Sequence, residues 1–119
     1  MARYVDGFLL PIPRKNLAAY KKIATTAGKV WREYGALEYR ECVGDDLNVK
    51  FGKAFPKQMK LKPGETVVFS WIVYKSKAHR NRVNAKVLQD PRIRMEGTPM
   101  PFDVKRMAYG GFEILVDLT

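Results

Sequence analysis

The stretch that decides the fold is Thr66–Tyr74, which reads TVVFSWIVY. Its odd-numbered and its even-numbered positions are both mainly apolar. Successive side chains of a β-strand point to opposite faces of a sheet, so this strand would be buried on both sides. Strands of this kind lie at the centre of a sheet. The sequence therefore predicts a layered protein built around one central strand.

Three regular elements are expected before this strand. Tyr4–Leu10 is a short apolar strand that the turn Pro11-Ile12-Pro13 would close. Lys15–Tyr34 has apolar residues at three- and four-residue spacing, which indicates a helix, and Gly35 stands where that helix would end. Leu37–Val43 alternates as a half-buried strand.

The rest of the chain supplies a long connection, a helix and a last strand. Leu47–Glu65 is the connection, Ser76 is the expected N-cap of a helix that ends near Asp90, and Tyr109–Leu118 is the last strand. The order β-α-β-β-α-β matches the ferredoxin-like arrangement, in which two helices cover one face of a four-stranded antiparallel sheet. We expect residues 1–119 to form one such α+β domain.

The face of the sheet opposite the helices needs a cover of its own. The central strand and the last strand are apolar on both faces, so a lone subunit would expose a large hydrophobic patch. A symmetric pair that packs sheet on sheet would bury it. The sequence therefore predicts a homodimer through the sheet face, with a barrel-like core between the two sheets.

The net charge of +10 is concentrated in the middle of the chain. Leu47–Gln89 holds ten Lys or Arg and one acid, Glu65, whereas the remainder holds twelve basic residues and eleven acids. Such asymmetry is one sign of a polyanion partner. A nucleic-acid-binding surface over Lys50 to Arg82 is the alternative function, with these candidate contacts: Lys53, Lys57 and Lys60. We favour a solvated surface, because the lysines lack the arginines and aromatics of a base-stacking platform.

Composition and the N-terminal residues indicate where the protein works. The longest uncharged run, Thr66–Tyr74, is far shorter than the ~20 residues of a membrane span, so no membrane partner is expected. The first residues lack the apolar stretch of a signal peptide. The single cysteine, Cys42, cannot form an internal disulfide and suits a reducing compartment. We expect a cytoplasmic protein.

A paired glycine, Gly110-Gly111, stands at the start of the last strand. Glycines inside strands often mark a bulge or the close approach of another group. Charged and aromatic residues nearby could orient an anionic or carbonyl-bearing ligand. Arg106 would bind it through two guanidinium N–H groups, and Tyr109 would donate a hydrogen bond from its hydroxyl. In the other interpretation, Asp103 caps a short turn and Arg106 pairs with it across the dimer. The ligand-binding candidates are therefore Asp103, Arg106, Tyr109 and Trp71, although Trp71 also suits the core or the interface.

Three segments give the chain its resemblance to a known family. They are Tyr4-Val-Asp-Gly-Phe8, Ser76-Lys-Ala-His-Arg-Asn-Arg-Val-Asn84 and Met100-Pro-Phe-Asp-Val-Lys-Arg-Met-Ala-Tyr-Gly-Gly-Phe112. Over its whole length the chain resembles the YbaA-like family of uncharacterised bacterial proteins, within the dimeric α/β-barrel superfamily. The resemblance implies the barrel dimer and a bacterial cytosolic origin, and it brings no established activity.

His79 is the candidate catalytic residue. It lies three residues after the expected cap Ser76, on the same helix stripe as Val83 and Val87, so its ring should face inward. The positive end of the helix would favour the neutral imidazole, which suits an acid-base residue. It would also suit an axial haem ligand, as in some haem-binding members of the resembled superfamily. We favour a partly buried histidine satisfied by a backbone group.

Residue counts exclude several chemistries. One histidine and one cysteine cannot build a multi-ligand zinc site, and no nucleophile motif or glycine-rich phosphate loop is present. No cofactor and no metal are predicted, and the sequence leaves open whether the protein is an enzyme. The function that the sequence favours is a homodimer of no established activity, with a small-molecule pocket between sheet and helices.

Overall fold

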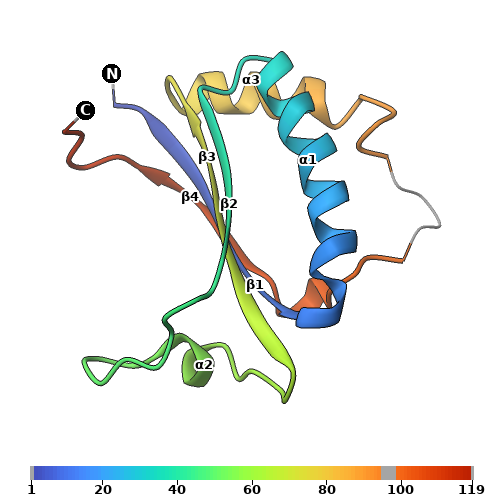
Figure 1. The fold of residues 1–119 in the computed structure, drawn as a ribbon. Coiled ribbons are helices and arrows are strands. Elements are labelled where there is room, and N and C mark those ends of the chain that lie inside the picture. Colours follow the sequence, from blue (N-terminus) through green and yellow to red (C-terminus); the bar gives the residue numbers. More distant parts are fainter. Residues whose placement is uncertain (1, 95–98, 119) are drawn as a thin grey trace.

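The computed structural model describes residues 2–94 and 99–118. These residues form an α+β fold with an open, four-stranded antiparallel sheet in the order β2-β3-β1-β4 (Figure 1). The strands are β1 (Tyr4–Pro13), β2 (Glu38–Val43), β3 (Glu65–Tyr74) and β4 (Ala108–Glu113). The helices are α1 (Leu17–Glu33), α2 (Phe55–Gln58) and α3 (Lys77–Val87), with 3-10 turns η1 (Arg14–Asn16) and η2 (Val104–Arg106). The expected α+β class and antiparallel sheet are confirmed.

Strand β3 lies inside the sheet, between β2 and β1. The sequence prediction of a central strand over Thr66–Tyr74 is therefore confirmed. On the helix side its residues are buried, from Thr66 through Ile72 to Tyr74. On the other side Val67 and Val73 are also buried, but Phe69 keeps 49% of its surface exposed. The second face of the strand is thus only partly covered in a single chain.

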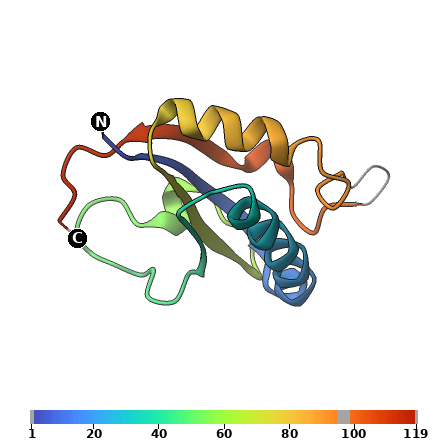
Figure 2. The same ribbon diagram turned by 90° about the horizontal axis from the view of Figure 1, so that it is seen from above.

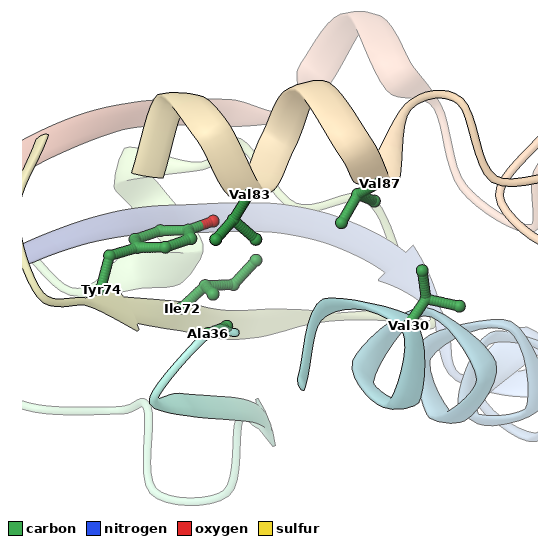
Figure 3. Close-up of a cluster of buried hydrophobic side chains, with 6 residues drawn as sticks. All are labelled: Val30, Ala36, Ile72, Tyr74, Val83 and Val87. Carbon is green, nitrogen blue, oxygen red and sulfur yellow. The ribbon is translucent and has the colours of Figure 1, made fainter. Parts of the chain in front are cut away.

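Helices α1 and α3 lie on one side of the sheet, and α2 lies on the other (Figures 1 and 2). Between α1, α3 and β3 the buried apolar side chains form one cluster (Figure 3). Its members are Val30, Ala36, Ile72, Tyr74, Val83 and Val87. A second cluster joins β1, α1 and β3 through Leu10, Ile12, Tyr20, Ala24 and Val68. Burying each large apolar side chain contributes about 1.5–3 kcal/mol, so these clusters fix α1 and α3 on the sheet.

Two predicted helix boundaries are confirmed. Gly35 follows α1 with φ of 114°, and the N–H groups of Gly35 and Ala36 donate to the carbonyls of Arg32 and Trp31. This is a Schellman motif, which favours glycine because the backbone is left-handed there. At the start of α3, the Ser76 hydroxyl accepts a hydrogen bond from the His79 N–H (3.1 Å).

The prediction that Pro11-Ile12-Pro13 closes the first strand is wrong, because β1 continues to Pro13. Odd-numbered residues of β1 turn their backbone groups toward β4, as the hydrogen bond from the Ile114 N–H to the Arg3 carbonyl shows. Strand β4 begins at Ala108, opposite Leu9. The two prolines therefore face a side of β1 where β4 is absent, and their missing N–H groups cost no hydrogen bond.

The last strand is shorter than its sequence pattern predicts. It was expected over Tyr109–Leu118, but β4 ends at Glu113. Glu113 pairs with Tyr4, the first residue of β1, so the chain after Glu113 has no β1 residue left to pair with as a strand. Alternation alone could not reveal this, because it says nothing of where the neighbouring strand starts. Leu115 and Leu118 are consequently 95% and 93% exposed.

Candidate functional site

Two cavities adjoin helix α1. The inner pocket, about 180 Å³, lies between α1, the sheet and segment 100–107. The outer groove, about 860 Å³, follows α1 along the β2 edge of the sheet. Both cavities share four lining residues, which are Tyr20, Ala24, Tyr39 and Glu41. These residues therefore form the wall between the two spaces.

The polar part of this wall is a carboxylate held by two phenols. The Tyr20 hydroxyl donates to Glu41 Oε1 (2.8 Å), and the Tyr39 hydroxyl donates to Glu41 Oε2 (2.6 Å). Burial raises the pKa of both tyrosines, and the adjacent Glu41 charge raises it further. Both phenols thus stay protonated and act as donors, while Glu41 acts as the acceptor.

The local sequence explains how these groups meet. Tyr39 and Glu41 are two residues apart in β2, so both point to the helix side of the sheet. Tyr20 and Gly28 lie two turns apart on α1 and face that strand. A Cβ atom at Gly28 would lie 2.8 Å from a ring carbon of Tyr39. The glycine therefore permits α1 to approach β2 closely enough for Tyr20 to reach Glu41.

Segment 100–107 covers the inner pocket and is tied down at both ends. The Asn16 side-chain amide donates to the Pro101 carbonyl (2.8 Å), and the Phe102 ring meets the Tyr20 ring edge to face (5.7 Å between centroids). At the far end, Arg106 forms a bidentate ion pair with Glu65 (2.7 and 2.9 Å). The cover of the pocket is thus anchored to η1, α1 and β3.

A second polar network lies under α3. Asp6 is 7% exposed and accepts from Asn84 (3.4 Å), and Arg80 Nε lies 3.3 Å from it. The Asn84 amide oxygen in turn accepts from the Trp31 indole (2.9 Å) and the Tyr74 hydroxyl (3.0 Å). Buried polar groups are tolerated when they are paired in this way. This network stabilises the position of α3 on the sheet.

The network also explains why one residue of the glycine pair, Gly111, has no side chain. A Cβ atom at Gly111 would collide with the Tyr4 hydroxyl and the Arg80 guanidinium, which lies over the Tyr4 ring (4.9 Å). At Gly110 the nearest side-chain atom, on Phe112, would be 3.9 Å away, an ordinary contact. The close approach expected from the sequence therefore occurs at Gly111, and it comes from side chains of the same chain.

Comparison with known proteins identifies the family. A family model described as "Protein of unknown function (DUF1428)" matches residues 3–104. The chain belongs to the DUF1428 family. It is 44% identical over 115 residues to the "Uncharacterized protein YbaA" of Escherichia coli strain K12, covering 97% of this chain and 98% of that protein. The protein of that name in Shigella flexneri matches with the same identity and coverage. The resemblance to the YbaA-like family of uncharacterised proteins is confirmed.

The chain is also similar to solved structures. The "De novo designed protein Foldit4" matches with a TM-score of 0.46 and 10% identity, over 94% of this chain and 98% of its own. No activity is established for the DUF1428 family by these comparisons. Further sites in this member must therefore be judged from its own geometry.

The predicted catalytic candidate, His79, lies beside the cap of α3. Its Nδ1 accepts a hydrogen bond from the Lys75 N–H (3.0 Å), and its ring meets the Tyr74 ring edge to face. Burial lowers the pKa of His79, and the charges of Lys75 and Arg82 lower it further. The imidazole is therefore neutral near pH 7, as expected. It lines neither the inner pocket nor the outer groove.

The other predicted ligand residues are not brought together. Asp103 caps η2 by accepting from the Lys105 N–H (3.0 Å), and within the chain Arg106 pairs with Glu65. Tyr109 is 72% exposed and stacks on Phe8 at the β4 edge of the helix side.

Trp71 lies on the opposite face of the sheet from Tyr109, as the strand register requires. Its indole donates to Glu38 Oε1 (2.9 Å), and its ring contacts Phe69 (5.2 Å between centroids). The set predicted from the sequence is therefore spread over two faces of the sheet.

Residues 50–60, called the lysine segment here, also contain aromatic side chains. Lys53, Lys57 and Lys60 are exposed in the connection around α2. Phe51 is 96% exposed and Phe55 46% exposed in the same connection. The statement that these lysines lack aromatic neighbours is therefore wrong.

Sequence reasoning also missed the wall of the inner pocket. A signal was present, because Glu41 is an acid on the otherwise apolar face of strand β2 that Tyr39 and Val43 share. Within residues 2–94 and 99–118, no group of three His, Cys, Asp or Glu side chains is placed to hold a metal ion. No helix in that part of the chain is long and apolar enough to cross a membrane.

Proposed function

We propose that the protein is a homodimer that binds a small molecule in the inner pocket of each subunit. The observation that carries the pocket is the Tyr20–Glu41–Tyr39 cluster, a hydrogen-bonding group in the wall of an otherwise apolar cavity. Ligand sites typically combine an apolar lining with a few convergent polar groups. The position of the pocket between α1 and the sheet agrees with this role.

The strand order supports a ferredoxin-like arrangement. The order β2-β3-β1-β4, with α1 and α3 on one side, is the order that a split β-α-β unit produces. In such an arrangement the helices cover one face and leave the other to a partner. The face opposite α1 and α3 is called the outer face here, and it includes Phe69, Trp71 and Phe112.

Exposure on the outer face supports a dimer. Phe69 is 49% and Phe112 61% exposed. Segment 44–64, with α2, and the residues after β4 both project to this side of the sheet (Figure 1). A second copy packed there would bury these rings, and stable interfaces bury about 1,200–2,000 Å² in total. The two sheets would then form a dimeric α/β barrel.

A pair of charge substitutions tests the dimer. Phe69→Glu places a carboxylate in the proposed interface, whereas Leu88→Glu makes the same change at a 61% exposed position at the end of α3. The first variant should sediment as a monomer and the second as a dimer. Dimeric Phe69→Glu protein would contradict the sheet-face interface.

A fragment titration tests the pocket. Amide resonances of the labelled protein are followed while a mixture of small organic molecules is added. The proposal predicts shifts concentrated on α1, β2 and segment 100–107. Saturable shifts confined to other surfaces would contradict it.

The proposal also includes a cytoplasmic location. Cys42 is exposed and unpaired, which supports a reducing environment such as the cytoplasm.

Nucleic-acid binding is a second candidate, favoured by one observation. Phe51 and Phe55 are exposed among the lysines of segment 50–60, and aromatic rings next to cations stack on unpaired bases. Affinity for a single-stranded RNA oligonucleotide should fall steeply with salt. Neutralising Lys53, Lys57 and Lys60 should weaken it, whereas neutralising three lysines of α1 should not. Equal losses in the two triple variants would contradict a specific surface.

A further inference from the structure

The inner pocket has the size of one aromatic ring. Its volume is about 180 Å³, and an engineered apolar cavity of about 150 Å³ in another protein binds benzene. Half of the lining residues carry an aromatic ring or a thioether, and besides Tyr20 these are Phe8, Trp31, Tyr39, Phe102, Met100 and Met107. Rings and methionine sulfur pack favourably on aromatic molecules. Size and lining therefore agree on a single-ring aromatic guest.

The polar end of the pocket is an acceptor. Each oxygen of the Glu41 carboxylate accepts one phenol hydrogen bond, and each has a further lone-pair site. Ser70, which is 5% exposed, lies opposite Glu41 in the β2–β3 ladder and also lines the pocket. A guest that carries an O–H or N–H group can donate to Glu41. A guest with its own carboxylate would be repelled by the same charge.

The same wall offers a route for entry. Tyr20, Tyr39 and Glu41 separate the inner pocket from the outer groove, and they line both. Rotation of the Tyr20 phenol away from Glu41 would join the two spaces. Once the guest is bound, its donor replaces the hydrogen bond that the tyrosine gave up, so Glu41 again has two partners.

We propose that the inner pocket binds a single-ring aromatic molecule that carries a hydroxyl or amino group, with that group donating to Glu41. This inference rests on the proposed small-molecule function, and it names the class of ligand. It does not depend on the dimer.

The test compares four probes, which are benzene, phenol, aniline and benzoate. Dissociation constants are measured by following amide resonances of the wild type, of Glu41→Gln and of the matched control Glu113→Gln, which alters an exposed acid of β4. Phenol and aniline should bind the wild type about tenfold or more tightly than benzene, since hydrogen bonds to charged groups are strong. Glu41→Gln should reduce that preference to about threefold or less, and Glu113→Gln should leave it unchanged.

A filling variant gives an independent readout. Ala27 lines the inner pocket and is absent from the lining of the outer groove, so Ala27→Phe should abolish the binding of benzene and phenol together. Its far-ultraviolet circular dichroism establishes that it is folded. If the variant does not fold, Glu41→Gln still decides the case.

The outcomes separate this inference from the proposed function. Equal affinity of the wild type for phenol and benzene, or tightest binding of benzoate, overturns the inference. Wild-type protein that binds none of the four probes but retains a different small molecule through purification overturns the ligand class and leaves the proposed function standing. Wild-type protein that binds no small molecule in either experiment overturns both.

Discussion

Gly28 is the position where packing of the candidate site is most directly tested. Alanine there would place a Cβ atom 2.8 and 2.9 Å from two ring carbons of Tyr39. The ring cannot simply rotate away, because Tyr39 donates to Glu41 (2.6 Å) and packs beside Trp31. Something in the α1–β2 contact must therefore move when Gly28 is replaced.

Two opposing effects set the magnitude for Gly28→Ala. Alanine is favoured over glycine inside a helix by about 1 kcal/mol. Overpacking a tight contact costs about 1–3 kcal/mol. The two together predict a net destabilisation of about 0–2 kcal/mol, instead of the gain of about 1 kcal/mol that an unobstructed site would give.

The assay is urea unfolding monitored by circular dichroism, with ligand binding measured in parallel. Thr26→Ala, at an exposed position of α1, is the control and should be neutral or slightly stabilising. Gly28→Ala should also alter binding in the inner pocket, because Tyr39 is displaced. A stabilisation of about 1 kcal/mol with unchanged binding would refute the close-packing argument.

Two further predictions concern ion pairs and the paired glycine. The hydrogen bonds from Arg106, aided by the Lys62 N–H, lower the pKa of Glu65 from 4.5 to about 2, so the stability from this pair is complete above pH 4.5 and lost as pH falls toward 2. Arg106→Gln should therefore destabilise the protein at neutral pH, and unfolding curves should show the difference from wild type shrinking in acid; a constant difference would argue against the pair. Gly111→Ala should destabilise the protein by about 1–3 kcal/mol, because the added Cβ atom would push the Tyr4 and Arg80 side chains away from position 111. Gly110→Ala should not destabilise it, because a Cβ atom there makes only an ordinary contact. Equal effects in thermal melts of the two variants would show that the network does not set this preference.

Local patterns predicted much of the fold. The apolar residues on both faces of Thr66–Tyr74 correctly predicted the central position of this strand in the sheet. Gly35 and Ser76 correctly predicted two helix ends, because caps act within a few residues. The predicted C-terminal ends of β1 and β4 were wrong, because each end depends on where a strand distant in sequence starts or stops. Pairing register is a tertiary property that single-strand patterns do not contain.

The candidate site was less accessible to sequence reasoning for the same reason. Glu41 acquires its role only when Tyr20, 21 residues away, is brought beside it. Arg106 was predicted to bind a ligand through its guanidinium group. That group instead forms an ion pair with Glu65, 41 residues away. Charged residues near a glycine pair suggest a site, but partners distant in sequence decide whether they are available for a ligand.

The central claim, a ligand-binding homodimer, is tested most directly by native mass spectrometry of the purified, untreated protein. One spectrum weighs the assembly together with anything that it retains. We expect twice the chain mass of 13.7 kDa, with a discrete small mass bound to each subunit. A bare monomer would contradict both the sheet-face dimer and the occupied pocket, and nucleotide adducts lost on adding salt would favour the lysine segment instead.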